Sequence, residues 1–429
     1  MGSVQQDMSS TFIVVGGGIA GLASAIALRA PKRRIVVLEQ SSLNREVGAT
    51  LSLQPNATKI VEKQWGMGDA LKRVGAMRDE GFNMYSIDGK LQRSIPLVSK
   101  TEYGADRMVY HRRDIHDTLK EFATQVDGFG EPTEIRTSSC VVACDLDEGI
   151  VTLKDGSVIK GDVIIGADGI KSTLRKDVLG YEVQAEPTGF SAYRLVLPSA
   201  DLEQNKDFRD VIDPRSSFTS MVMGHDRRMI MGPARDGNLF SVVALVPDQR
   251  AEVEAGNSWT SRGDLETLLN EYKDFPAWAT APFRLAKDDI GLWQLRDTEP
   301  LETWHRGRVI LIGDAAHAML PTQGQGASQA IEDAEALGAF FSDLKGDIQL
   351  EEVQSRFKKI FEARFERATT IQRYSREAAR PATDKGDTKI KMNPAEFMDY
   401  NCLYNGAKDW AHRRVGTESL EKELQALAV

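Results

Sequence analysis

The sequence predicts an α/β protein with a doubly wound parallel sheet, a β-meander and a second, smaller domain built on a mainly antiparallel sheet. Three observations favour this fold class. A strand–glycine turn–helix–strand pattern opens the chain in "TFIVVGGGIAGLASAIALRAPKRRIVVLEQ". Apolar stretches separated by Asp/Gly turns follow in "SSCVVACDLDEGIVTLKDGSVIKGDVIIGADG". Strand-like stretches then dominate residues 187–297.

In the first part of the chain, local patterns predict each element. The apolar runs "TFIVV" and "RRIVVLEQ" predict buried parallel strands, and "IAGLASAIALRA" between them predicts a helix. Helical spacing returns in "PNATKIVEKQWGMGDALKRVG" and in "YHRRDIHDTLKEFATQV". Between these two helical stretches, "SIDGKLQRSI" predicts a hairpin that turns at Asp88-Gly89.

The second half of the chain changes character twice. "GFSAYRLVL", "SFTSMVM", "RMIMGP" and "LFSVVALV" predict the strands of the second domain. The stretch "RVILIGDAAHAMLPTQGQGASQAIEDA" then returns to a strand followed by a helix. Residues 350–379 predict one long helix, and "ARPATDKGDTKIKMNP" predicts a polar loop before a C-terminal helical tail.

Composition limits the classes of partner and compartment. A chain of 429 residues is long enough for two or three lobes. The net charge of −9 argues against nucleic acid and anionic membranes as partners. Three cysteines are too few for a disulfide framework, and the six histidines show no metal-ligand spacing. With neither a signal peptide nor a membrane-spanning run in view, we expect a cytoplasmic protein that binds no metal and no membrane.

The glycine turn near the start carries the first functional signal. Gly16 allows the tight turn, Gly18 lets a pyrophosphate approach the backbone, and Gly21 lets helix and strand pack closely. The helix N-terminus then offers free N–H groups to phosphates. Glu39 ends the second strand, where an acid accepts hydrogen bonds from a ribose diol. The pattern therefore predicts nucleotide binding.

Two further strand ends carry an aspartate. Asp168-Gly169 follows an apolar strand in "GDVIIGADGIKSTLR", and Gly313-Asp314 follows "RVILI". Either aspartate has an alternative interpretation as a simple helix N-cap, because Asp is a favoured capping residue.

The motifs "GGGIAG", "GADGIKSTLR" and "LIGDAAHAMLPTQGQGASQAIEDA", in this order, resemble those of the single-component FAD-dependent aromatic hydroxylases. Salicylate hydroxylase and para-hydroxybenzoate hydroxylase are familiar members, and finer features look most like fungal members of secondary metabolism. The resemblance covers roughly residues 10 to 375 and leaves the last 50 or so uncovered.

The resemblance implies a fold and a division into domains. A Rossmann-like FAD-binding domain is expected from residues 10–80, 105–186 and 298–375. Residues 81–104 and 187–297 are expected to form the substrate domain, and residues 376–429 a C-terminal loop and helical tail.

The resemblance also assigns cofactor contacts, so that both glycine motifs serve one FAD molecule. The first motif and Glu39 hold the ADP half, Arg112 reaches the phosphate region, and Arg113 is the neighbouring candidate. Asp314 contacts the ribityl chain, and the helix N-terminus after Gly324 stabilises the reduced flavin. The full set of expected cofactor residues is Gly16, Gly18, Gly21, Glu39, Gly48, Ala49, Arg112, Asp168, Gly313, Asp314, Gly324, Gln325, Gly326 and Ala327.

On the substrate side, the resemblance assigns catalytic roles to Arg194 and Pro321. Strand alternation predicts that Tyr193 and Arg194 point to opposite faces of a sheet. Phenol-oxidising relatives often carry a tyrosine before the proline of "RMIMGP", where this chain has Gly232, or Met231 if the register slips. This departure weakens the expectation of a phenol and leaves room for a bulkier substrate such as an indole. A methionine-lined pocket and ordinary core are alternative interpretations of Met221, Met223, Met229 and Met231.

The expected function is that of an FAD-dependent monooxygenase acting through a C4a-hydroperoxyflavin. It would use NADPH or NADH and O2 to hydroxylate or epoxidise an electron-rich aromatic small molecule, as a monomer or homodimer. No second Gly-x-Gly-x-x-Gly follows a strand, which argues against a two-Rossmann reductase. Two alternatives stay open: a flavin epoxidase or reductase acting on a non-aromatic isoprenoid, and a prenyl-protein-binding scaffold of the GDP-dissociation-inhibitor type.

Overall fold

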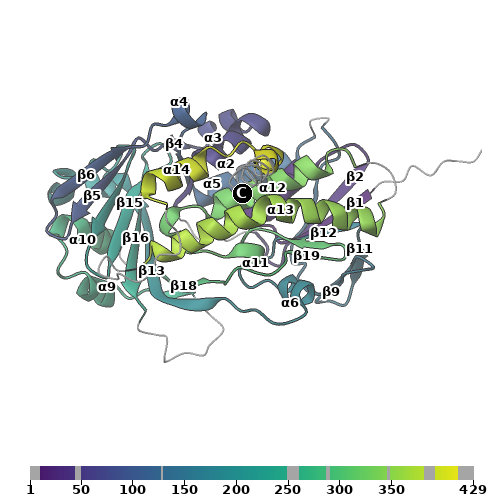
Figure 1. Cartoon of the computed structure of the whole chain (residues 1–429). Helices are drawn as coiled ribbons and strands as arrows, with labels where there is room; N and C mark the ends of the chain where they lie inside the picture. The colour runs from purple at the N-terminus through teal and green to yellow at the C-terminus, as the bar shows by residue number, and fades with distance from the viewer. Residues whose placement is uncertain are drawn as a thin grey trace, which may run out of the picture.

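Two large sheets lie at opposite ends of the molecule, with helices across and between them (Figure 1). The computed structural model describes residues 10–43, 50–126, 129–248, 260–286, 290–344, 348–380 and 392–413. Among these residues, no helix is both long enough and apolar enough to cross a membrane. Nor do the described ranges bring together three His, Cys, Asp or Glu side chains in a way that would hold a metal ion.

The first sheet is the predicted parallel one. Its strand order is β19-β20-β12-β1-β2-β8, and every neighbouring pair is parallel except β19 and β20. The strands are β1 (Ser10–Val15), β2 (Arg33–Leu38), β8 (Glu134–Arg136), β12 (Val163–Gly166), β19 (His305–Arg306) and β20 (Val309–Leu311). Because the parallel strands run the same way, their carboxyl ends share one edge, and the glycine turn, the Asp168 loop and the Gly313 loop all begin there.

Long helices pack beside this sheet. They are α1 (Ile19–Leu28), α5 (Arg112–Thr124), α12 (Gly326–Phe341) and α13 (Leu350–Glu377), and α13 crosses the molecule in Figure 1. Their apolar side chains share one core with the sheet, in which the rings of Phe12 and Phe341 meet edge to face with centroids 5.7 Å apart. The meander of β9 (Val141–Asp145), β10 (Ile150–Leu153) and β11 (Val158–Lys160) contributes to the same core.

The second large sheet has the order β17-β18-β13-β16-β15-β14-β5-β6 and is antiparallel except where β5 pairs with β14. Its strands are β5 (Gly81–Ser86), β6 (Leu91–Pro96), β13 (Glu186–Pro198), β14 (Phe218–Met223), β15 (Arg228–Ala234), β16 (Leu239–Pro247), β17 (Thr260–Arg262) and β18 (Gly291–Asp297). One face carries a core shared with α8 (Lys206–Arg209), α9 (Leu265–Glu271) and α10 (Ala277–Ala286). The other face turns toward the first sheet, where Ala192 and Leu245 cluster with Leu320.

The remaining elements are short. A small sheet joins β3 (Thr50–Leu53), β7 (Met108–His111) and β4 (Met77–Arg78). The short helices are α2 (Pro55–Lys59), the π-helix η1 (Ile60–Gln64), α3 (Gly68–Arg73), α4 (Lys100–Tyr103), α6 (Leu174–Leu179), α7 (Ser199–Glu203), α11 (Asp314–His317), the 3-10 helix η2 (Pro321–Gln323) and α14 (Pro394–Cys402).

Most predicted elements are confirmed. The hairpin turns at Gly89, with φ +80°, and the long helix after residue 350 is α13. The single helical stretch predicted after Pro55 is wrong, because it divides into α2, η1 and α3 around Gly66, which has φ +67°. The predicted polar loop falls mostly on residues 381–391, which lie outside the described residues.

Candidate active site

Three sequence motifs that lie far apart in the chain meet at the carboxyl edge of the parallel sheet. A Cβ atom added at Gly16 would lie 2.3 Å from the carbonyl oxygen of Ala167, the residue before Asp168. A Cβ atom added at Gly313 would lie 3.0 Å from the Cβ of Ala20, in the first turn of α1. The glycine turn therefore touches both aspartate loops.

The glycine turn has the geometry expected of a phosphate-binding turn. Gly16 has φ +105°, and a Cβ at Gly21 would lie 1.9 Å from the Gly16 carbonyl oxygen, so both positions require glycine. Gly18 differs, because a Cβ there would meet nothing within 4 Å. Gly18 is also the N-cap of α1, and no described side chain caps that helix end. Open space thus lies beside free N–H groups and the positive end of the helix dipole.

Glu39 lies against the same turn. One carboxylate oxygen accepts a hydrogen bond from the Gly17 N–H at 2.7 Å, and the other accepts one from the Ser41 N–H at 2.7 Å. The half-buried carboxylate therefore faces the position where the ribose of a nucleotide was expected.

The first turn of α5 also reaches this edge. Nε2 of His116 lies 2.7 Å from the Gly17 carbonyl oxygen. Arg112 precedes His116 by one helical turn and so lies on the same face of α5. Its charge acts on Asp314 and on Arg194, so Arg112 lies near each of these side chains. The neighbouring candidate, Arg113, is exposed and pairs with Asp117 at 3.5 Å.

Asp168 accepts hydrogen bonds with one side-chain oxygen, and the other oxygen has no partner among the described residues. Its Oδ2 accepts hydrogen bonds from the Thr173 and Leu174 N–H groups at 2.7 and 3.3 Å. Its Oδ1 is buried without a hydrogen-bond partner among the described residues, and burial raises the pKa of the carboxyl. Asp168 therefore binds the N–H groups at the start of α6 although the N-cap residue is Thr173, and its second oxygen is free for a ligand.

Arg175 joins this loop to the next one, a role that the sequence did not reveal. Its buried guanidinium donates to the carbonyl oxygens of Asp314 and Ala315, both at 2.9 Å, and of Ile170 at 3.0 Å. The two aspartate loops are therefore fixed relative to each other.

Asp314 follows Gly313, which has φ +57°, and begins α11. The Asp314 side chain is open to solvent, yet the surrounding protein is dense enough that loss of hydration raises its pKa. His317, Arg112 and Arg175 only partly offset this effect. An exposed carboxylate at this edge can accept a hydrogen bond from a ligand hydroxyl.

The second glycine motif forms the N-terminus of α12. Gly324 has φ +61°, and a Cβ there would lie 3.1 Å from the Ser52 hydroxyl oxygen of β3. A Cβ at Gly326 would meet nothing within 4 Å, so open space faces this helix end as well. The buried Gln325 side chain turns inward, where its Oε1 accepts from Asn56 Nδ2 at 3.3 Å, and Ala327 packs against the core beside α1. Gly48 and Ala49, which precede β3, lie outside the described residues.

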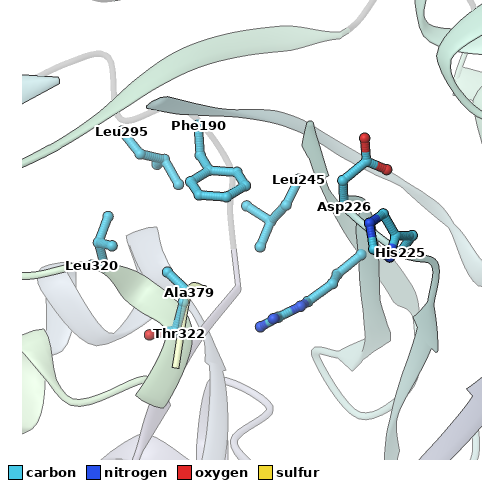
Figure 2. Close-up of a pocket in the computed structure, with 9 residues that line it drawn as sticks. Phe190, His225, Asp226, Leu245, Leu295, Leu320, Thr322 and Ala379 are labelled. Carbon is cyan, nitrogen blue, oxygen red and sulfur yellow. The ribbon is translucent and has the colours of Figure 1, made fainter. Parts of the chain in front are cut away.

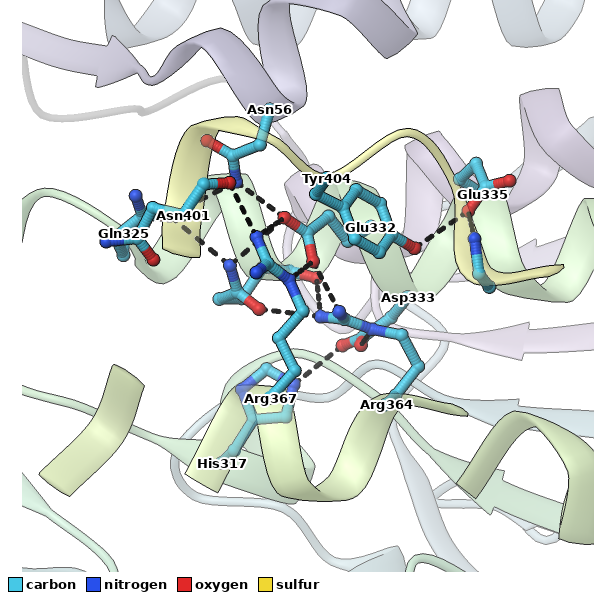
Figure 3. Close-up of polar contacts among 12 residues, drawn as sticks. Asn56, His317, Gln325, Glu332, Asp333, Glu335, Arg364, Arg367, Asn401 and Tyr404 are labelled. Carbon is cyan, nitrogen blue, oxygen red and sulfur yellow. Dashed lines mark hydrogen bonds and ion pairs between the residues drawn. The ribbon is translucent and has the colours of Figure 1, made fainter. Parts of the chain in front are cut away.

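A group of four buried charges lies behind these loops and was not predicted. Glu332 and Asp333 of α12 pair with Arg364 and Arg367 of α13, all four with essentially no exposed surface (Figure 3). We call these four residues the charge cluster. Burial alone would raise the pKa of the Asp333 carboxyl, but His317, Arg364 and the Gly313 N–H lower it to about 2. Asp333 is therefore ionised and acts as a fixed acceptor behind the Gly313 loop.

Arg194 and Tyr193 lie on opposite faces of the second sheet, as predicted. Tyr193 is part of the core on the helical side, whereas Arg194 lies on the face that turns toward the first sheet. The Arg194 guanidinium lies over the ring of Trp293, 5.1 Å from its centroid. Burial, followed by repulsion from Arg112, lowers the pKa of Arg194, and its Nε is buried without a hydrogen-bond partner in the described structure.

A pocket opens on this same face, between the two sheets (Figure 2). Phe190 and Leu245 of the second sheet, Leu320 from the loop before η2, and Ala379 after α13 form apolar walls, with Leu295 beside them. His225, Asp226, Arg228 and Thr322 add polar groups. An apolar wall combined with polar side chains is common in small-molecule sites.

The other substrate-side predictions concern Pro321, Gly232 and the methionines of the second sheet. Pro321 begins η2 next to Leu320, so it borders the pocket wall, and it is exposed. Gly232 lies on the face of Ile230 and Arg228, while Met231 is buried in the core, so the face holds no side chain at the expected tyrosine position. Met229 and Met231 are ordinary core, and only Met221 and Met223 remain half-buried on the site-facing side.

Comparison with known proteins decides what kind of enzyme this is. A family model described as an FAD binding domain matches residues 9–347. The chain belongs to this family. It is 31% identical over 410 residues to 3-hydroxybenzoate 6-hydroxylase 1 of Aquipseudomonas alcaligenes, which covers 92% of this chain and 98% of that protein. It is 30% identical over 342 residues to hispidin-3-hydroxylase of Neonothopanus nambi, across 77% of this chain and 80% of that protein.

Solved structures agree with this assignment. A salicylate hydroxylase in complex with its substrate superimposes with a TM-score of 0.76 at 26% identity, across 95% of this chain and 98% of that one. The protein is accordingly an FAD-dependent monooxygenase of the aromatic hydroxylase family. The described residues fit FAD, because open space lies at Gly18 and Gly326, each beside a helix N-terminus, and the carboxylates of Glu39 and Asp314 lie at the same edge.

Proposed function

We propose that this monooxygenase uses NADH or NADPH and O2 to hydroxylate or epoxidise an electron-rich aromatic small molecule, phenolic or indolic, in fungal secondary metabolism. The observation that carries the proposal is Arg194, a half-buried cation whose Nε is buried without a hydrogen-bond partner among the described residues, on the sheet face that also forms the pocket. A phenolate or another developing anion on an aromatic ring is the natural partner of such a group.

In this proposal, FAD supplies the activation of O2, and the chain supplies binding and positioning. The turn at Gly18 and the carboxylate of Glu39 hold the ADP half. Asp314 accepts a hydrogen bond from the ribityl chain, and the N–H groups after Gln325 face the electron-rich edge of the ring system. Arg194 orients the substrate oxygen or nitrogen, Pro321 borders the reacting ring, and the apolar walls exclude water. We also propose that the chain divides into an FAD-binding domain and a substrate domain, followed by a C-terminal tail. Their residues are 10–80, 105–186 and 298–375, then 81–104 and 187–297, and finally 376–429.

The proposed size of the substrate rests on one missing side chain. The names of relatives point to phenols, since they act on 3-hydroxybenzoate, hispidin and salicylate. Gly232 has no side chain where phenol-oxidising relatives often have tyrosine, and this absence favours a ring system larger than one benzene. We therefore favour a polycyclic phenol or indole over a simple benzoate.

The test is anaerobic reduction of the purified holoenzyme, followed by the loss of flavin absorbance in a stopped-flow instrument. NADH and NADPH are compared, each alone and with panels of phenols, indoles and non-aromatic isoprenoids. We expect one aromatic class to accelerate reduction and to yield an oxygenated product in air. Acceleration by isoprenoids alone would replace the proposal with the epoxidase alternative, and a protein that fails to take up FAD would overturn it.

A further inference from the structure

The charge cluster supports both flavin-facing loops from behind, each through a different carboxylate. Asp333 Oδ2 accepts a hydrogen bond from the Gly313 N–H at 2.9 Å and lies 2.7 Å from Nε2 of His317. Glu332 Oε1 accepts from Nδ2 of Asn56 at 2.5 Å, and the same Nδ2 reaches Oε1 of Gln325 at 3.3 Å (Figure 3). Adjacent residues of α12 thus brace the Asp314 loop and the Gln325 loop separately.

Two arginines of α13 hold these carboxylates in place. Arg364 donates through Nε to Asp333 Oδ1 at 2.9 Å, and also to Glu332. Arg367 clasps Glu332 with two bonds of 2.8 Å, one from Nε and one from Nη2. A bidentate pair of this kind fixes direction as well as distance, so the position of Glu332 depends on that of Arg367.

The position of Arg367 is set in turn by α14 and the residues that follow it, residues 393–410, which we call the C-terminal segment. The Arg367 guanidinium donates to the carbonyl oxygens of Tyr400 and Asn401 at 2.5 and 2.8 Å. Three aromatic rings surround it, those of Tyr400, Tyr404 and Trp410, with centroids 5.3, 4.6 and 4.8 Å from Cζ. Stacked aromatic faces are favourable neighbours for a buried guanidinium.

The C-terminal segment is also anchored to α12 and α2 directly. Glu335 Oε2 accepts from the Tyr404 hydroxyl at 2.9 Å and from the Ala407 N–H at 2.8 Å. Lys59 of α2 donates to the Cys402 carbonyl oxygen at 2.9 Å. The segment therefore touches the two helices that carry Glu332 and Asn56.

We propose that the C-terminal segment is a positioning element for the isoalloxazine end of FAD. It fixes Arg367, and through Glu332 and Asn56 it keeps the Gln325 loop aimed at the flavin ring. The ADP end depends on other contacts, those among Gly17, Glu39 and His116. The proposal rests on the assignment of the FAD site, and it predicts an effect on one half of the cofactor alone.

The test measures FAD and ADP affinity on the same full-length apo-protein. In Arg367→Lys, the charge remains but the two-bond clasp of Glu332 is lost, and in Trp410→Leu one ring of the enclosure is lost. For both variants we expect FAD affinity to fall about tenfold or more while ADP affinity changes less than about twofold. We also expect the flavin midpoint potential to become more negative, because the loop no longer stabilises the reduced ring.

Arg33→Lys is the matched control. Arg33 is a buried arginine that donates to the Leu28 and Phe341 carbonyl oxygens at 2.8 and 2.9 Å, but it lies at the opposite edge of the parallel sheet. We expect it to leave both affinities unchanged. Equal losses of FAD and ADP affinity in Trp410→Leu, or no loss of either, would overturn the proposal. If Arg367→Lys does not fold, the result of Trp410→Leu alone tests the proposal. Wild-type protein that binds neither ligand would instead refute the FAD site itself.

Discussion

At the scale of single residues, Asp314 combines an open side chain with a raised pKa, and this has a measurable consequence. The ionised carboxylate is the stronger hydrogen-bond acceptor, and a raised pKa means that it takes up a proton at a higher pH than an ordinary aspartate. The fraction of protein ready to bind FAD therefore falls as the pH is lowered through that raised value.

We predict that FAD affinity declines on acidification in the wild type and that Asp314→Asn flattens this decline. At neutral pH the variant should bind FAD about tenfold more weakly, the size of one lost charge-assisted hydrogen bond. Fluorescence titration of apo-protein across a pH series measures both effects, with folding checked by circular dichroism at each pH. An unchanged pH slope in Asp314→Asn would assign the effect to another group.

Arg194 is the second residue whose role is specific enough to test. Removing its guanidinium in Arg194→Met should lower the rate of product formation about 100-fold, as loss of one stabilising donor typically does. Flavin content should stay normal, because the assigned cofactor contacts remain. The measurement is the rate of product formation, together with the product yield per NAD(P)H consumed. Arg113→Met is the control, since Arg113 is exposed and pairs only on the surface of α5.

At the scale of elements, two glycines of the glycine turn meet different structural requirements. A Cβ at Gly18 meets nothing within 4 Å, and its φ of −75° suits alanine, whereas a Cβ at Gly21 collides with the Gly16 carbonyl oxygen. The first glycine thus leaves room for the ligand, and the other allows α1 to pack.

We predict opposite phenotypes for the two alanine variants. Gly18→Ala should keep or slightly raise the melting temperature of the apo-protein, and should weaken FAD binding about tenfold or more, because the methyl group occupies ligand space. Gly21→Ala should lower the melting temperature even without FAD. Thermal melts of both apo-proteins and FAD titrations suffice, and equal melting temperatures in the two variants would contradict the assignment.

Local patterns predicted elements well and their distant partners poorly. The hairpin at Asp88-Gly89 follows from its turn chemistry, but its parallel pairing with β14 joins segments that no local signal connects. The same limit hid the charge cluster, since "AIEDAEA" looks like any helix face. A signal did exist in α13, where Arg364 and Arg367 continue the apolar spacing of Phe357, Ile360 and Ile371. Two arginines on a buried stripe require buried carboxylates.

At the scale of the whole molecule, Arg228 joins the second sheet to the end of α13. Its guanidinium donates to the Ala378 and Arg380 carbonyl oxygens at 2.7 and 2.9 Å, and it also lines the pocket. A cation at the carboxyl end of a helix is favourable, and here the helix belongs to the other sheet. The contact therefore holds the pocket walls together.

We predict that Arg228→Met lowers the free energy of unfolding by about 2 kcal/mol, the scale of hydrogen bonds from a charged donor. Arg215→Met is the control, because the Arg215–Glu203 ion pair is exposed and should contribute less than the Arg228 contact. Urea unfolding followed by tryptophan fluorescence compares the two. If both variants lost the same free energy of unfolding, the contact of Arg228 with the end of α13 would stabilise the protein no more than a surface ion pair does.

The enclosure of Arg367 also bears on the order of events during translation. Ribosomes release a chain from its N-terminus onward, so the glycine turn and Glu39 emerge long before Tyr404 and Trp410. A nascent chain that has completed the parallel sheet already offers a place for the adenosine half of the cofactor, while the loop for the ring system still lacks its brace. Under the proposal above, tight binding of the whole cofactor follows the docking of the C-terminal segment, whereas the adenosine half can bind before it.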